Sequence, residues 1–172
     1  MNALSNETKL KIEKTIKNLK ANKMDAYYCD NKEDACNLVK TLIKKGDVIS
    51  SGGSVTLKET GVYDIITSSD YKYLDRAAEG ITPEEVEEVY HKTFSSDVYF
   101  ASSNAITENG ELYNVDGNSN RVAAILYGPK SVILVCGYNK IVKNIDEAID
   151  RVKRIAAPSN TIRLNIETPC GK

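Results

Sequence analysis

Two segments of the sequence combine glycine with hydroxyl, amide or charged side chains, which are groups that bind small anions. The first, 51–56, reads Ser-Gly-Gly-Ser-Val-Thr and follows the apolar run 47–51. Glycine lets backbone N–H groups approach a ligand because no Cβ stands in the way. A helix that begins here would add N–H donors and a partial positive charge. The pattern fits a phosphate or carboxylate site, and it equally fits an ordinary strand-to-helix turn with Ser54 as N-cap. The candidate binding residues are Ser51, Gly52, Gly53, Ser54 and Thr56.

The second segment, 102–121, is dense in Asn, Ser, Asp and Gly and ends at Arg121, one of five arginines in the chain. The planar guanidinium group suits a carboxylate or phosphate because its N–H groups match paired oxygens. The alternative is that Asp116 or Ser119 caps the next helix and Arg121 pairs with a surface acid. Both interpretations stay open at this stage. The candidate binding residues are Asn104, Asn114, Asp116, Gly117, Asn118, Asn120 and Arg121.

Three carboxylates, those of Glu59, Glu108 and Asp116, are weak candidates for a catalytic acid or base, because proton transfer needs a positioned carboxylate. His91 is the sole histidine and lies between charged neighbours on a predicted helix. This position indicates a surface residue, so the sequence offers little support for a histidine-based triad or metal site.

The four cysteines form no CxxC pair, so no metal site is predicted from their spacing. Cys29 and Cys136 lie inside apolar runs, and we expect buried, reduced thiols there. Cys170 lies in a Pro-Cys-Gly tail, where an exposed thiol has no evident role. The sequence contains no motif that names a cofactor.

The elements that must position these residues alternate between helix-like and strand-like patterns. Apolar residues at helical spacing predict helices over about 6–22, 35–43 and 145–156, the second ended by Gly46 as C-cap and the third stopped before Pro158. Shorter helices are expected over 54–60, 61–67, 83–94 and 121–127, with Thr82 as N-cap and Pro83 in the first turn of the third.

Short apolar runs predict strands at 25–29, 47–51, 71–74, 97–102 and 131–136, and the last is expected at the sheet centre because it is the most apolar. The dipeptide Asn109-Gly110 predicts a β-hairpin near 106–115. Strands that alternate with helices indicate an α/β domain whose mostly parallel sheet has helices on both faces. In such sheets ligands bind beyond the carboxyl ends of the strands, where 51–56 and 114–121 fall.

Composition limits the class of protein. The chain has 172 residues, 27% of them charged, and a formal net charge of −1, which fits one domain and no nucleic-acid partner. The sequence contains neither an apolar run long enough to span a bilayer nor an apolar leader, so we expect a cytoplasmic protein that does not bind membranes. Whether the chain forms a homo-oligomer stays open.

Several ordered blocks resemble the LUD (lactate-utilisation) domain family. The most specific is Gly52-Gly53-Ser54-Val55-Thr56-Leu57 followed by Glu59-Thr60-Gly61. Further matching blocks are 74–76, 102–107, 110–117, 120–123, 155–158 and 168–170, so the resemblance covers nearly the whole chain. Members of this family continue after Thr-Pro-Cys into a Cys-rich stretch and a closing strand. The printed sequence ends at Lys172, so we expect a single LUD domain over 1–172 without them.

The resemblance implies a Rossmann-like fold similar to that of ribose-5-phosphate isomerases and CoA-transferases. The hairpin-and-helix block is also similar to that of methylthioribose-1-phosphate isomerases and related initiation-factor subunits. Those relatives bind sugar phosphates, nucleotides or CoA near this block. Lactate-utilisation members act with iron–sulfur partner proteins in oxidising lactate to pyruvate. The resemblance assigns no catalytic residue.

The sequence and the resemblance together leave three candidate functions. The first is a subunit or accessory protein of a lactate (2-hydroxy acid) oxidation system, which binds a small anion at the Gly-Gly-Ser loop and passes electrons to a partner protein. The second is a non-catalytic binding or scaffolding module, for which an exposed apolar patch would argue. The third is a stand-alone enzyme acting on a sugar phosphate or acyl-CoA, for which only fold analogy argues.

Overall fold

The computed structural model describes residues 4–165, and these divide into two compact units, each with its own sheet. Unit 1 comprises residues 4–28, 103–115 and 137–165, and unit 2 comprises residues 29–102 and 116–136. The chain therefore passes from one unit to the other several times. The predicted binding residues fall in both units.

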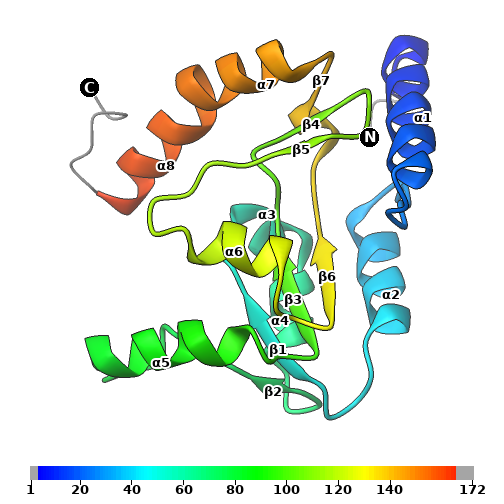
Figure 1. Ribbon diagram of the computed structural model, residues 1–172. Coiled ribbons are helices and arrows are strands. Elements are labelled where there is room, and N and C mark those ends of the chain that lie inside the picture. The colour runs from blue at the N-terminus through cyan, green and yellow to red at the C-terminus, as the bar shows by residue number, and fades with distance from the viewer. Residues whose placement is uncertain (1–3, 166–172) are drawn as a thin grey trace. The chain divides into compact units, whose positions relative to one another are not determined.

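Unit 2 contains a four-stranded parallel sheet in the order β2-β1-β3-β6 (Figure 1). The strands are β1 (Val48–Ser51), β2 (Lys72–Tyr73), β3 (Val98–Ala101) and β6 (Ser131–Leu134). The helices are α2 (Lys32–Leu42), α3 (Val55–Thr60), α4 (Val62–Ile66), α5 (Pro83–Thr93) and α6 (Asn120–Leu126). This arrangement confirms the predicted α/β class, with a parallel sheet and helices on both of its faces.

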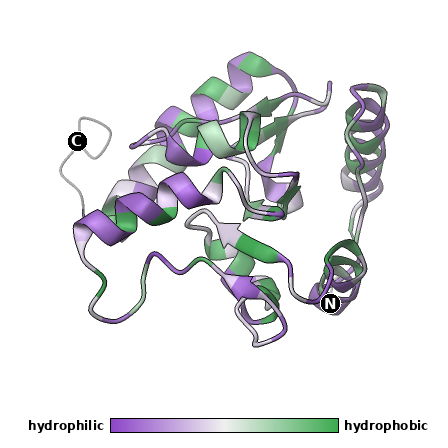
Figure 2. Cartoon of the chain, turned by 60° about the horizontal axis from the view of Figure 1, so that its bottom comes forward, coloured by the Kyte–Doolittle hydropathy of each residue, from purple (hydrophilic) through white to green (hydrophobic). Residues whose placement is uncertain are grey.

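Alternation along β3 places apolar side chains on both faces of this sheet. Val98 and Phe100 pack with Leu57 of α3 and Ile66 of α4, while Tyr99 and Ala101 pack with residues of α6. Successive side chains of a strand point to opposite faces, so a fully buried strand needs helices on each side. The helices carry hydrophobic residues on part of their surface and hydrophilic residues elsewhere (Figure 2).

Unit 1 is built around the predicted hairpin. Strand β4 (Ala105–Thr107) pairs antiparallel with β5 (Leu112–Tyr113) and parallel with β7 (Ile141–Val142). Gly110 in the hairpin turn has φ +84°, and a Cβ there would lie 2.7 Å from the backbone carbon of Asn18. The remaining elements are α1 (Asn6–Ala21), a 3₁₀ turn (Tyr138–Lys140), α7 (Ile145–Arg151), a π-helical segment (Val152–Ala156) and α8 (Ala157–Leu164).

Helix starts follow the predicted capping signals. The Thr82 side chain accepts a hydrogen bond from the Glu85 backbone, and Glu85 accepts one from the Thr82 backbone, so the two form a capping box with Pro83 in the first turn. Ser54 caps α3 in the same way through the Leu57 backbone N–H. Local side-chain chemistry therefore sets these boundaries.

Four predicted details are wrong. Residues 25–29 form no strand; Tyr27 and Tyr28 are exposed, and β propensity has no effect without a neighbouring strand. The apolar strand 131–134 is at an edge of the described sheet rather than at its centre. Helix α2 ends at Leu42, so Gly46 lies in the following turn and is no C-cap. The last helical segment continues to Leu164. Pro158 falls in the first turn of α8, where a backbone N–H has no partner within the helix, so proline costs no hydrogen bond there.

Four smaller predictions concern membrane spans, the histidine and the cysteines. No helix within residues 4–165 is long and apolar enough to cross a bilayer. His91 is exposed on α5, as expected. Cys29 and Cys136 are free thiols, but the prediction that they are buried is wrong, because both are half-buried. The prediction for Cys170 lies outside the described residues.

Candidate functional site

The glycine loop of unit 2 connects the end of β1 to the start of α3. A Cβ built on Gly52 would lie 2.8 Å from the Tyr99 hydroxyl and 3.1 Å from Cδ of Arg121. A Cβ built on Gly53 would lie 3.1 Å from Nη2 of Arg76. Two arginine side chains and a tyrosine hydroxyl therefore lie directly against the two glycines, and any larger residue would displace them.

A small recess opens beside this loop; the non-atom space in and in front of it, open solvent included, is about 220 Å³. Each residue that lines it carries a hydroxyl, phenol, amide or guanidinium group. The lining residues are Ser50, Ser51, Arg76, Tyr90, Thr93, Tyr99 and Asn120. We call this hollow the glycine-loop recess. The hydrogen-bonding groups of these residues can orient a small polar ligand.

Arg76 supplies a cation to the recess from the segment between β2 and α5. Its guanidinium carbon lies 5.7 Å from the centroid of the Tyr90 ring on α5. Within residues 4–165 the guanidinium has no hydrogen-bond or ion-pair partner. A half-buried guanidinium normally donates its N–H groups to acceptors. Because Arg76 has none in the described chain, its donors are available for an anionic ligand.

Tyr99 projects from β3 into the same recess. The residue is only 2% exposed, and its hydroxyl makes no hydrogen bond to any group in the described part of the chain. Burial raises the pKa of this phenol to about 12, against the opposing effect of the nearby Arg76 and Arg121 charges. Tyr99 is therefore protonated at neutral pH and presents a neutral O–H donor to the recess.

The hydroxyls on the strand side of the recess are paired with one another. The Ser50 and Thr93 oxygens are 2.7 Å apart, and Thr93 donates to the Val89 carbonyl, so Ser50 donates to Thr93. The Ser51 oxygen lies 2.7 Å from the Tyr73 hydroxyl, and burial raises the pKa of Tyr73 to about 12. These bonds fix the wall, in contrast to the unpaired Tyr99 hydroxyl.

Asp116 caps α6. Its Oδ2 accepts the backbone N–H groups of Arg121 at 2.8 Å and Val122 at 3.0 Å. Two first-turn amides that a ligand could use are therefore already bonded to this carboxylate. Arg121 contributes its side chain instead, which donates from Nη1 to the Ser102 carbonyl at 3.0 Å and lies along Gly52. The capping role of Asp116, left open by the sequence, is what the structure shows.

The other predicted residues of unit 2 take different positions. Asn120 lines the recess, while Gly117 and Asn118 are exposed in the loop before α6. Ser54 is used as the N-cap of α3, and Thr56 is half-buried in that helix. Among the predicted binding residues, the recess and its rim thus bring together five. These are Ser51, Gly52, Gly53, Asn120 and Arg121.

Asn104 and Asn114 belong to unit 1, where they hold the hairpin base together. The Asn104 backbone N–H donates to the Asn114 side chain at 3.2 Å, and the Val115 backbone N–H donates to the Asn104 side chain at 3.0 Å. Arg151 adds a 2.7 Å bond to the Asn104 carbonyl. These contacts give both asparagines a structural role.

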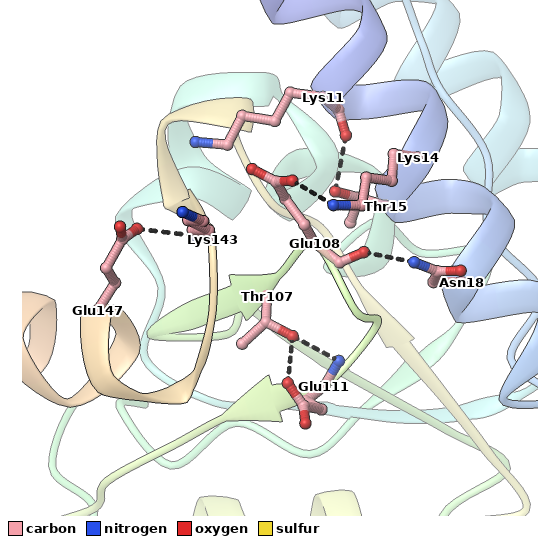
Figure 3. Close-up of polar contacts among 9 residues, drawn as sticks. All are labelled: Lys11, Lys14, Thr15, Asn18, Thr107, Glu108, Glu111, Lys143 and Glu147. Carbon is pink, nitrogen blue, oxygen red and sulfur yellow. Dashed lines mark hydrogen bonds and ion pairs between the residues drawn. The ribbon is translucent and has the colours of Figure 1, made fainter.

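None of the three candidate carboxylates lines the recess. Glu59 is exposed on α3, and Asp116 is the cap of α6. Glu108 belongs to unit 1, where its carboxylate pairs with Lys14 at 2.9 Å and its carbonyl accepts from Asn18 (Figure 3). Within residues 4–165 no three His, Cys, Asp or Glu side chains gather in the way a metal ion requires.

Sequence reasoning missed Arg76, Tyr90 and Tyr99. Arg76 is one of the five arginines, but it lies in a polar segment with no helix or strand pattern of its own. Tyr99 lies in an apolar strand, a position typical of ordinary core residues. One signal was available in the sequence. Side chains alternate between the two faces of a strand, so Tyr99 lies on the same face of β3 as Ala101, the face that α6 covers.

Comparison with known proteins identifies the family of the chain. The model of the LUD domain family matches residues 12–172, and the chain therefore belongs to the LUD domain family. No curated protein and no solved structure matched the chain. The membership predicted from the Gly52–Gly61 block is confirmed.

Proposed function

We propose that this chain is a subunit or accessory protein in lactate (2-hydroxy acid) utilisation and binds a small carboxylate in the glycine-loop recess. The observation that supports the proposal most is the Arg76 guanidinium, which lines the recess beside Gly53 without an acceptor in the described chain. A carboxylate would supply that acceptor in a bidentate, charge-assisted pair. Membership of the LUD domain family is consistent with this role.

The residues around the recess divide the binding work. Arg76 and the side chain of Arg121 provide positive potential, and the absence of Cβ atoms at Gly52 and Gly53 lets these side chains lie against the loop. Oxidation of a 2-hydroxy acid to a 2-oxo acid releases two electrons and two protons. We propose, from the family resemblance, that an iron–sulfur partner protein accepts the electrons and that this chain binds and orients the acid.

Calorimetric titration of the purified chain with lactate, pyruvate, inorganic phosphate and CoA tests the proposal. We expect saturable binding of lactate and pyruvate, because both present a carboxylate to Arg76. Binding of phosphate and CoA without the carboxylates would favour an enzyme of sugar phosphates or acyl-CoA. Lack of binding by all four compounds would contradict any small-anion role of the recess.

A further inference from the structure

The buried Tyr99 hydroxyl is unexplained by carboxylate binding to Arg76. The phenol is 2% exposed, lines the recess and has no hydrogen-bond partner within the described residues. A buried hydroxyl without a partner lowers the stability of the fold, so such groups are rare unless a ligand or water completes them. The hydroxyls of Ser50, Ser51 and Thr93 in the same wall are all bonded.

The position of this hydroxyl relative to Arg76 defines what would complete it. Tyr99 Oη lies against Gly52, and Nη2 of Arg76 lies against the next residue, Gly53. Both side chains line the recess, so one small ligand that enters it can contact both donors. A carboxylate bound by Arg76 leaves the Tyr99 hydroxyl to an oxygen on the rest of that ligand.

We infer that the Tyr99 hydroxyl binds the oxygen on carbon 2 of the ligand, so that the recess selects 2-hydroxy and 2-oxo acids over unsubstituted carboxylates. The inference rests on the proposed function and adds the feature of the substrate that is recognised. A site built to hydrogen-bond a substrate oxygen rejects the analogue that lacks it, because its own buried polar group is then left unpaired. A protonated phenol can donate to either a hydroxyl or a keto oxygen.

Lactate and propionate differ only in the hydroxyl on carbon 2, so titration of both measures this recognition. We expect the natural chain to bind lactate at least about tenfold more tightly than propionate, as one hydrogen bond to a buried partner allows. In Tyr99→Phe the lactate affinity should fall to that of propionate, while the propionate affinity stays within about twofold. Tyr127→Phe is the control, since Tyr127 is 88% exposed in the same unit.

The outcomes separate this inference from the proposed function. Equal binding of lactate and propionate by the natural chain would overturn the inference and leave the carboxylate site standing. Binding of neither acid would overturn the proposed function itself. A Tyr99→Phe chain that still prefers lactate would also overturn the inference. Tyr99→Phe removes only an unpaired hydroxyl, so its melting temperature should not fall. If the variant is nevertheless unstable, the ratio of lactate to propionate affinity in the natural chain tests the inference by itself.

Discussion

Replacing Gly52 with alanine is expected to weaken lactate binding at least about tenfold and to lower the free energy of unfolding by about 1–3 kcal/mol. The added Cβ would lie 2.8 Å from the Tyr99 hydroxyl, 3.1 Å from Cδ of Arg121 and 3.2 Å from its Cγ. Tyr99 is almost fully buried and has little space to move. The methyl group would therefore displace groups that form the wall of the recess, which calorimetry and urea unfolding would both detect.

Gly117→Ala is the matched control for this substitution. Gly117 lies in the exposed loop before α6, and a Cβ there would have no atom within 4 Å. We expect its unfolding free energy to stay within about 0.5 kcal/mol of the natural value, and its lactate affinity to be unchanged. Natural affinity in Gly52→Ala would show that the ligand binds elsewhere, since the new Cβ points at the groups assigned to binding.

Replacing Arg76 with alanine is expected to weaken lactate binding by about tenfold to a hundredfold while leaving the fold intact. Charge-assisted hydrogen bonds contribute about 1.5–3 kcal/mol, and each 1.4 kcal/mol corresponds to a factor of ten in affinity. Arg76→Lys keeps the charge but loses the planar fork, so an intermediate affinity is expected. Stability should change by less than about 1 kcal/mol, because within the described residues Arg76 makes a cation–π contact with Tyr90 but no hydrogen bond or ion pair.

Arg154→Ala provides the control for removal of a positive charge. Arg154 lies in unit 1, where it pairs with Asp150 one turn earlier in the chain. Its loss changes the net charge by the same amount without touching the recess, so the lactate affinity should be preserved. If Arg76→Ala and Arg154→Ala bind lactate equally well, Arg76 takes no direct part in holding the ligand.

Local chemistry made part of the fold predictable. The Thr82-Pro83 start of α5, the Ser54 cap of α3 and the turn at Asn109-Gly110 each depend on neighbouring residues alone. The order of the strands in the sheet was not predictable in the same way. Apolar composition indicates that a strand such as 131–134 is covered, but its place in the sheet depends on which strands pair, and it lies at an edge.

In the candidate site, too, only the residues with a local sequence pattern were predictable. Gly52 and Gly53 carried a signal because a double glycine between a strand and a helix is unusual, and Arg121 followed a polar turn. The sequence could not show that Asp116 would take the first amides of α6. Nor could it bring Arg76 to Gly53, since that approach depends on the path of the chain between β2 and α5. The residues without a local pattern thus became the principal candidates.

Determining a crystal structure of the chain with bound lactate tests the central claim most directly. We predict electron density for the acid in the glycine-loop recess, with its carboxylate on the Arg76 guanidinium and its carbon-2 oxygen within hydrogen-bond distance of the Tyr99 hydroxyl. Lactate bound at another place, with the Arg76 and Tyr99 groups still unpaired, would contradict the account.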